Sequence, residues 1–170
     1  MKALARHLFA VTALPFTMAV VIPAAIARAD LVRALRPPTG FGLIGWIGGA
    51  ALFAIGLVLF VASLRRFAVD GEGTLAPWDP PRRLVLDGPY RYVRNPMISG
   101  VMMVLFGEAA LASSATLLYW AATFLAVNAV YIPLVEEPQL VHRFGASYDA
   151  YRKHVPRLFP RPRPWDGRGS

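Results

Sequence analysis

The chain has 170 residues, of which 56% are hydrophobic and only 16% charged, and its net charge is +8. This composition excludes an intrinsically disordered chain and a soluble domain with one water-exposed surface. The absence of cysteine excludes a disulfide framework and thiolate chemistry, and the three histidines are scattered, so we expect no metal site.

Long apolar runs predict four membrane-spanning helices. Residues 8–27 and 37–64 contain no Asp, Glu, Lys or Arg, and residues 95–135 contain only Glu108. Runs of this length suit a hydrocarbon core of ~30 Å, and the alternation that a membrane barrel needs is absent. We therefore expect an all-α integral membrane protein with a single membrane domain over residues 1–170. Its spans are predicted at about residues 7–27, 41–64, 97–113 and 117–135.

The first of these runs has a second interpretation. Lys2 and Arg6 precede an apolar stretch that ends in Ala25-Ile26-Ala27, which is also the pattern of a secretory signal peptide. We favour a membrane span because the apolar stretch is long for a signal peptide. Pro15 and Pro23 predict kinks within it.

The cations predict the orientation of the chain in the membrane. The five segments outside the predicted spans contain 2, 3, 6, 0 and 7 Lys and Arg residues in chain order. An even number of spans places the first, third and fifth segments on one side. The positive-inside rule makes that side cytoplasmic, most simply at a bacterial inner membrane, with both termini in the cytoplasm. The basic residues flank spans, so they indicate lipid head groups and not nucleic acid.

Glycines follow one another closely in the second span. Gly45 and Gly49 form a small-xxx-small pattern, which permits close approach of another helix. We interpret the pattern as packing within the bundle, with a dimer contact as the alternative. The sequence does not predict the oligomeric state.

Two polar stretches, residues 71–96 and 136–164, lie at the two ends of a predicted helical hairpin. The hairpin comprises the third and fourth spans, joined by the short segment 113–116, so both stretches must meet at the cytoplasmic face. Leu140, Phe144, Tyr148 and Tyr151 recur at helical spacing, which predicts an amphipathic helix over residues 139–153 in the second stretch.

The charges of the two stretches suit a zwitterionic ligand. Asn95-Pro96 is a helix-start signal, and Arg91 and Arg94 directly precede it, so this end favours an anion. Glu136 and Glu137 end the fourth span and suit a cation. S-adenosylmethionine combines a carboxylate, an ammonium group and a sulfonium in this way.

At these residues the chain resembles the isoprenylcysteine carboxyl methyltransferase-like family of membrane methyltransferases, which is related to the phospholipid methyltransferases. The matching motifs are Gly88-Pro89-Tyr90-Arg91-Tyr92-Val93-Arg94-Asn95-Pro96-Met97 and Glu136-Glu137-x-x-Leu140-x-x-x-Phe144-Gly145-x-x-Tyr148-x-x-Tyr151-x-x-x-Val155-Pro156-Arg157.

The resemblance implies an S-adenosylmethionine pocket at the cytosolic face, with S-adenosylhomocysteine as the product, open to the bilayer for a lipophilic acceptor. Carried over by position, Glu137 and Arg94 are the candidate catalytic residues. The candidate cofactor-binding residues are Tyr90, Arg94, Asn95, Pro96, Gly100, Glu136, Glu137 and Tyr148. Arg91, Glu108 and Arg143 are the candidates for acceptor binding.

The sequence departs from the family pattern at three places. Asn95 stands where the family often has His, Ile98 stands where it often has Tyr, and residues 128–135 lack the Arg that prenylcysteine-processing members carry. We expect methyl transfer to a lipophilic acceptor, with carboxylate O-methylation favoured. The alternatives are a phospholipid-type N-methyltransferase and a non-catalytic membrane protein of the same fold that binds a lipid or a partner.

Overall fold

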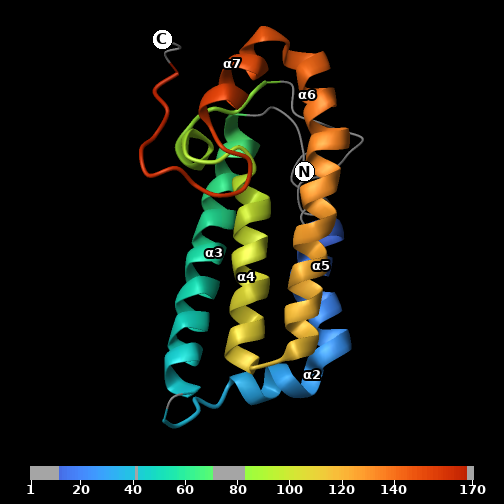
Figure 1. The fold of residues 1–170 in the computed structure, drawn as a ribbon, viewed down its shortest axis with the longest axis vertical. Helices are drawn as coiled ribbons and strands as arrows, with labels where there is room; N and C mark the ends of the chain where they lie inside the picture. The colour runs from blue at the N-terminus through green and yellow to red at the C-terminus, as the bar shows by residue number, and fades with distance from the viewer. Residues whose placement is uncertain (1–11, 41, 71–82, 168–170) are drawn as a thin grey trace. The chain divides into compact units, whose positions relative to one another are not determined.

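The computed structural model describes residues 12–40, 42–70 and 83–167, and every regular element within them is helical (Figure 1). This agrees with the predicted all-α class. The elements in chain order are η1 (Thr12–Val21), α2 (Ile22–Ala34), α3 (Gly42–Asp70), η2 (Gly88–Arg91), α4 (Pro96–Ala112), α5 (Ala115–Tyr131), η3 (Ile132–Glu136), α6 (Glu137–Phe144) and α7 (Ala146–His154).

Among the described residues, three helical stretches are long and apolar enough to cross a membrane: Pro15–Ala34, Gly42–Asp70 and Ala115–Phe144. Helix α4 is also apolar but has 17 residues. At a rise of ~1.5 Å per residue it is about 26 Å long, near the lower limit for a span. Large apolar side chains such as Ile44, Val58 and Leu134 are exposed on these helices, as expected for surfaces that face lipid. The protein is an integral membrane protein.

The described chain forms two compact units. The first comprises residues up to Val58 together with Gly100–Ala126, and the second comprises Leu59–Ser99 together with the residues from Val127 onward.

In the first unit, α3 and α4 pack through glycines. A Cβ atom at Gly49 would lie 2.8 Å from the backbone nitrogen of Leu111, and one at Gly107 would lie 2.7 Å from that of Phe53. A Cβ at Gly56 would likewise lie 2.7 Å from the carbonyl oxygen of Gly100. Gly45 has nothing within 4 Å of its Cβ position. Gly49 of the small-xxx-small pair therefore serves packing within the chain, whereas Gly45 does not.

Helix α2 is kinked in the first unit. Ala27 has non-helical backbone angles (φ −143°, ψ 34°), so the break within α2 falls four residues after Pro23. Beyond it, Leu31 and Ala34 pack on a buried cluster with residues from both sides of the α4–α5 turn. That cluster consists of Ala27, Ala109, Ala112 and Leu117.

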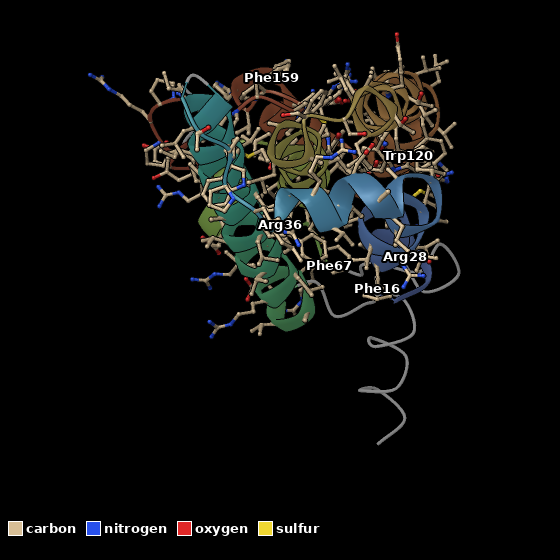
Figure 2. The ribbon with its side chains drawn as sticks, turned by 90° about the horizontal axis from the view of Figure 1, so that it is seen from below. Phe16, Arg28, Arg36, Phe67, Trp120 and Phe159 are labelled. Carbon is tan, nitrogen blue, oxygen red and sulfur yellow. The ribbon has the colours of Figure 1, made fainter. Side chains whose placement is uncertain are left out.

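Polar contacts fasten η1 and α2 to the hairpin in the same unit. The Ser114 hydroxyl donates to Asp30 at 2.5 Å. The indole N–H of Trp120, labelled in Figure 2, donates to the carbonyl of Met18 at 3.1 Å. Residues 28–34, which the sequence assigned to a loop outside the first span, are thus helical and attached.

In the second unit, the helix that contains Val127–Tyr131 does not end at the two glutamates. It continues through the π-helical turn η3, which contains Pro133, into α6. Proline lacks a backbone N–H, and a π-helical turn accommodates the lost hydrogen bond. Glu137 therefore lies inside a continuous helix, and its backbone N–H donates to the carbonyl of Ile132 in the π-helical turn. The helix thus continues past Glu136 and Glu137, where the sequence placed the end of the fourth span.

The predicted amphipathic helix over residues 139–153 is two helices. Gly145 separates α6 from α7 with φ +52° and ψ −130° (Figure 1), a conformation that suits glycine because it has no Cβ atom. The apolar spacing that predicted one helix is retained on both sides of the break. Tyr148, Tyr151, Val155 and Trp165 form the buried core of this unit.

Residues 155–167, the C-terminal strap, follow α7 without regular secondary structure and run along the segment that leads into α4. The backbone N–H of Arg94 donates to the carbonyl of Pro156 at 2.8 Å, and that of Arg161 to Tyr92 at 3.0 Å. The Ser99 hydroxyl donates to the carbonyl of Leu158 at 2.7 Å. Backbone pairing thus attaches the strap to both sides of the α4 start.

Candidate active site

Two arginine side chains of the second unit meet at the carboxylate of Glu137. Arg94 Nη1 lies 3.0 Å from Glu137 Oε1. Arg157 binds the same carboxylate with two nitrogens, Nε at 2.6 Å from Oε1 and Nη2 at 3.2 Å from Oε2. The side chains of Arg94 and Glu137 are each 9% exposed, whereas that of Arg157 is 36% exposed. The cluster therefore has a buried pair and one outer partner.

Short-range structure places each of these groups. Glu137 begins α6, and Arg94 lies two residues before Pro96, the first residue of α4. Arg157 is on the C-terminal strap, and its carbonyl accepts from both the backbone N–H and the side-chain amide of Asn95, each at 3.2 Å. Asn95 thus holds the strap. The described part of the first polar stretch, residues 83–96, is in direct contact with the second stretch, and residues 71–82 lie outside the described residues.

Tyrosines surround the cluster. Arg94 Nη1 donates to the Tyr148 hydroxyl at 3.2 Å, and the Tyr151 hydroxyl donates to the carbonyl of Tyr90 at 2.6 Å. Burial raises the pKa of Tyr148, an effect that the Arg94 charge partly opposes. Burial, and the neighbouring Tyr151 and Glu136, raise the pKa of Tyr90 as well. Both hydroxyls are therefore protonated at neutral pH and can each donate one hydrogen bond.

Three buried donors of this unit have no hydrogen-bond acceptor among the residues that the structure describes. They are Arg94 Nε, the Tyr90 hydroxyl and the indole N–H of Trp165. A buried donor without an acceptor costs about 1–3 kcal/mol, so such groups mark places where a ligand can supply the missing oxygen. Arg94 belongs to the cluster itself: it directs one nitrogen to Glu137 and leaves another for a ligand.

An open depression of about 440 Å³ lies beside the cluster. Its lining comprises Pro133, Glu137, Pro138, Val141, His142 and Arg152. Glu137 therefore connects the buried cluster to a surface large enough for part of a nucleotide-sized ligand.

Nine of the eleven sequence-predicted site residues belong to this second unit. They are Tyr90, Arg91, Arg94, Asn95, Pro96, Glu136, Glu137, Arg143 and Tyr148. Among them, Arg94, Glu137 and Tyr148 are brought into direct contact. Glu136 adjoins Glu137 in sequence and is partly buried.

The residues predicted for acceptor binding lie outside the cluster of Arg94, Glu137 and Arg157. Arg91 Nε donates to the carbonyl of Trp165 at 2.6 Å and so fastens the strap. Arg143 is exposed on α6 beside Phe144, with its guanidinium carbon 6.0 Å from the ring centre. Gly100 and Glu108 belong to the first unit, where Glu108 Oε2 is buried without a hydrogen-bond partner in the described part of the chain.

Sequence reasoning missed Arg157 as a member of the cluster. The motif that carries it, Val155-Pro156-Arg157, was noticed, but nothing in the linear pattern shows that this arginine folds back over 20 residues onto Glu137. The sequence offered one signal: a buried acidic residue such as Glu137 needs a cationic partner, and the basic residues that follow it are candidates.

Comparisons with known proteins identify the family of the chain. The family model described as phospholipid methyltransferase matches residues 44–147, more than half of the chain. No solved structure matches the chain. A curated relative, methanethiol S-methyltransferase 2 of Bradyrhizobium diazoefficiens, is 33% identical over 75 residues, which are 42% of this chain. The match spans 27% of that relative's length. The chain belongs to the phospholipid methyltransferase family.

Proposed function

We propose that the protein transfers a methyl group from S-adenosylmethionine to a lipophilic acceptor at the cytosolic membrane face. The observation that carries the proposal is the buried Arg94–Glu137 pair, 3.0 Å apart, in a unit where Arg94 Nε and the Tyr90 hydroxyl have no acceptor among the described residues. The pair connects the start of α4 with the helix that continues from α5. The unpaired donors can bind the anionic part of a zwitterionic ligand, and the glutamates can bind its cationic part.

The donor and acceptor groups of the site fit this cofactor. Arg94 Nε and the Tyr90 hydroxyl suit the carboxylate or hydroxyl oxygens of the ligand. Glu136 and Glu137 suit its ammonium group. Bound S-adenosylmethionine would supply an electrophilic methyl group on a sulfonium, which needs no covalent nucleophile from the protein.

The chain's own residues would orient the reactants and exclude water. Arg94, held by Glu137 and Tyr148, has little freedom to rotate, so it offers Nε in a fixed direction. An acceptor that is already an anion needs only to be positioned. An amine or hydroxyl acceptor must lose a proton, and Glu137 is the nearest candidate base.

Among acceptors we favour a carboxylate, because the site combines cationic side chains with apolar helices. A phospholipid amine is the alternative that the family description suggests, and a thiol is the one that the relative's name suggests. A labelled methyl donor offered with carboxylate, amine and thiol acceptors of matched chain length separates these three. A non-catalytic lipid- or partner-binding protein would methylate none of them and would not bind the cofactor in calorimetry.

We expect Glu137→Gln to lower turnover by about 100-fold or more, because an amide neither neutralises the cationic ligand nor accepts a proton. Labelled methyl transfer by the purified protein in detergent measures this. Asp149→Asn is the matched control, since Asp149 is a partly exposed acid paired with Arg152 on α7. Equal rates for wild type and Glu137→Gln would reject the role of Glu137.

A further inference from the structure

Arg157 differs from the other groups of the cluster in its attachment and exposure. It comes from the C-terminal strap, whose backbone is anchored without the Arg157 side chain. Asn95 donates to the carbonyl of Arg157, and the Ser99 hydroxyl donates to that of Leu158. The strap therefore does not need the guanidinium to stay in place, and the side chain is available for another task.

The contacts of Glu137 limit what its carboxylate can still bind. A carboxylate offers about four lone-pair sites, two on each oxygen. Oε1 accepts from Arg157 Nε, and Oε2 accepts from Arg157 Nη2. Arg94 Nη1 lies 3.0 Å from Oε1 as an ion-pair partner, so the lone-pair site left for a ligand is on Oε2.

The geometry of Arg157 sets the direction in which this lone-pair site on Oε2 points. Its two nitrogens bind the two oxygens side by side, so the plane of the carboxylate is set by the plane of the guanidinium. The hydrogen bond and charge of Glu137 raise the pKa of Arg157, so the arginine stays charged. Arg94 alone, through one nitrogen, would let the carboxylate rotate.

We propose that Arg157 is a positioning residue for methyl transfer: it orients the Glu137 carboxylate so that a single site on Oε2 faces the reactants. The inference rests on the proposed function and adds to it a residue on the C-terminal strap. Lysine cannot replace arginine here, because an ammonium group is a point charge without the two-pronged geometry.

The first test needs no cofactor. In purified protein in detergent, the thermal stabilities of Glu137→Gln, Arg157→Gln and the double variant form a double-mutant cycle. We expect a non-additive result, with the double variant less destabilised than the sum of the single variants. Additive effects would overturn the inference, whatever the protein methylates.

The second test separates orientation from attachment of the strap. For Arg157→Lys we expect kcat to fall by about 100-fold, the effect of misplacing a reacting group, with KM for the acceptor nearly unchanged. Added methylguanidinium should restore part of the kcat of Arg157→Ala, because the arginine side chain is accessible from outside.

Arg161 provides the matched control. It is an arginine of the same strap whose Nη1 donates to the carbonyl of His154 at 2.8 Å and holds the strap to α7. Arg161→Lys should keep the wild-type kcat. Equal loss in the Arg157 and Arg161 variants, or wild-type kcat in Arg157→Lys, would overturn the inference. A wild-type protein that binds no S-adenosylmethionine would instead reject the proposed function and leave the stability cycle to decide the role of Arg157.

Discussion

Arg94 and Glu137 are both 9% exposed in their side chains, but they do not depend on each other equally. Glu137 has a second cation in Arg157, whereas Arg94 has the Tyr148 hydroxyl as its other partner. Loss of the glutamate removes the nearest counter-ion of the buried Arg94. Loss of Arg94 leaves the Glu137 carboxylate with a two-pronged arginine. The consequences for stability are therefore asymmetric.

Glu137→Ala is expected to destabilise the protein by about 3–5 kcal/mol, and Arg94→Ala by less, since a buried charge left unpaired is the larger penalty. Thermal denaturation in detergent, followed by circular dichroism, compares the two. Arg152→Ala serves as control, because its pair with Asp149 is largely exposed and contributes at most ~1 kcal/mol. A larger loss for Arg94→Ala would contradict this account of the cluster.

At the scale of elements, α3 and α4 approach each other so closely that only glycine fits at the contacts. The atoms nearest to where a Cβ would stand at Gly49 and Gly107 include backbone atoms, which cannot rotate away as a side chain can. Lipid offers no hydrophobic driving force between helices, so close backbone packing contributes more to their association than it does in water.

Gly49→Ala should therefore destabilise the protein by about 1–3 kcal/mol, the usual cost of overpacking. Gly48→Ala is the matched control one residue earlier, where nothing lies within 4 Å of the Cβ position. Alanine is the better helix former by about 1 kcal/mol, so this control should be neutral or slightly stabilising. The two variants are compared by their midpoints of thermal denaturation, and equal midpoints would exclude a tight α3–α4 contact.

At the scale of the whole molecule, the distribution of cations predicts the orientation of the chain. Fifteen of the 18 Lys and Arg residues belong to the first, third and fifth segments outside the predicted spans. The remaining three, Arg28, Arg33 and Arg36, lie at the other end of the first span. Arg33 forms an ion pair with Asp30, 3.3 Å away.

We expect both termini to lie in the cytoplasm of a bacterial host, because segments with more cations are retained there. Reporter fusions at the C-terminus and after residue 36 test this, with a cytoplasmic signal from the first and an external one from the second. The same signal from both positions would contradict the predicted odd number of spans between them and remove the cytosolic placement of the site.

The sequence by itself determined the membrane class, the helical spans and the two polar stretches, because uncharged runs and flanking cations are local properties of a chain in a bilayer. It also brought Arg94 and Glu137 into one hypothesis, since a hairpin requires its two ends to meet. It did not predict the break at Gly145, because the apolar spacing on α6 and α7 continues across a single residue of unusual backbone angle.

Only the tertiary structure decided the partners of Glu137 and the packing of the glycines. Arg157 reaches the carboxylate through a strap without regular structure, and such a path has no sequence period to reveal it. Gly45 and Gly49 are equivalent in the sequence, yet only Gly49 faces α4. Pair contacts between distant segments depend on the folded backbone as a whole, and this is the physical reason that they could not be read from the order of the residues.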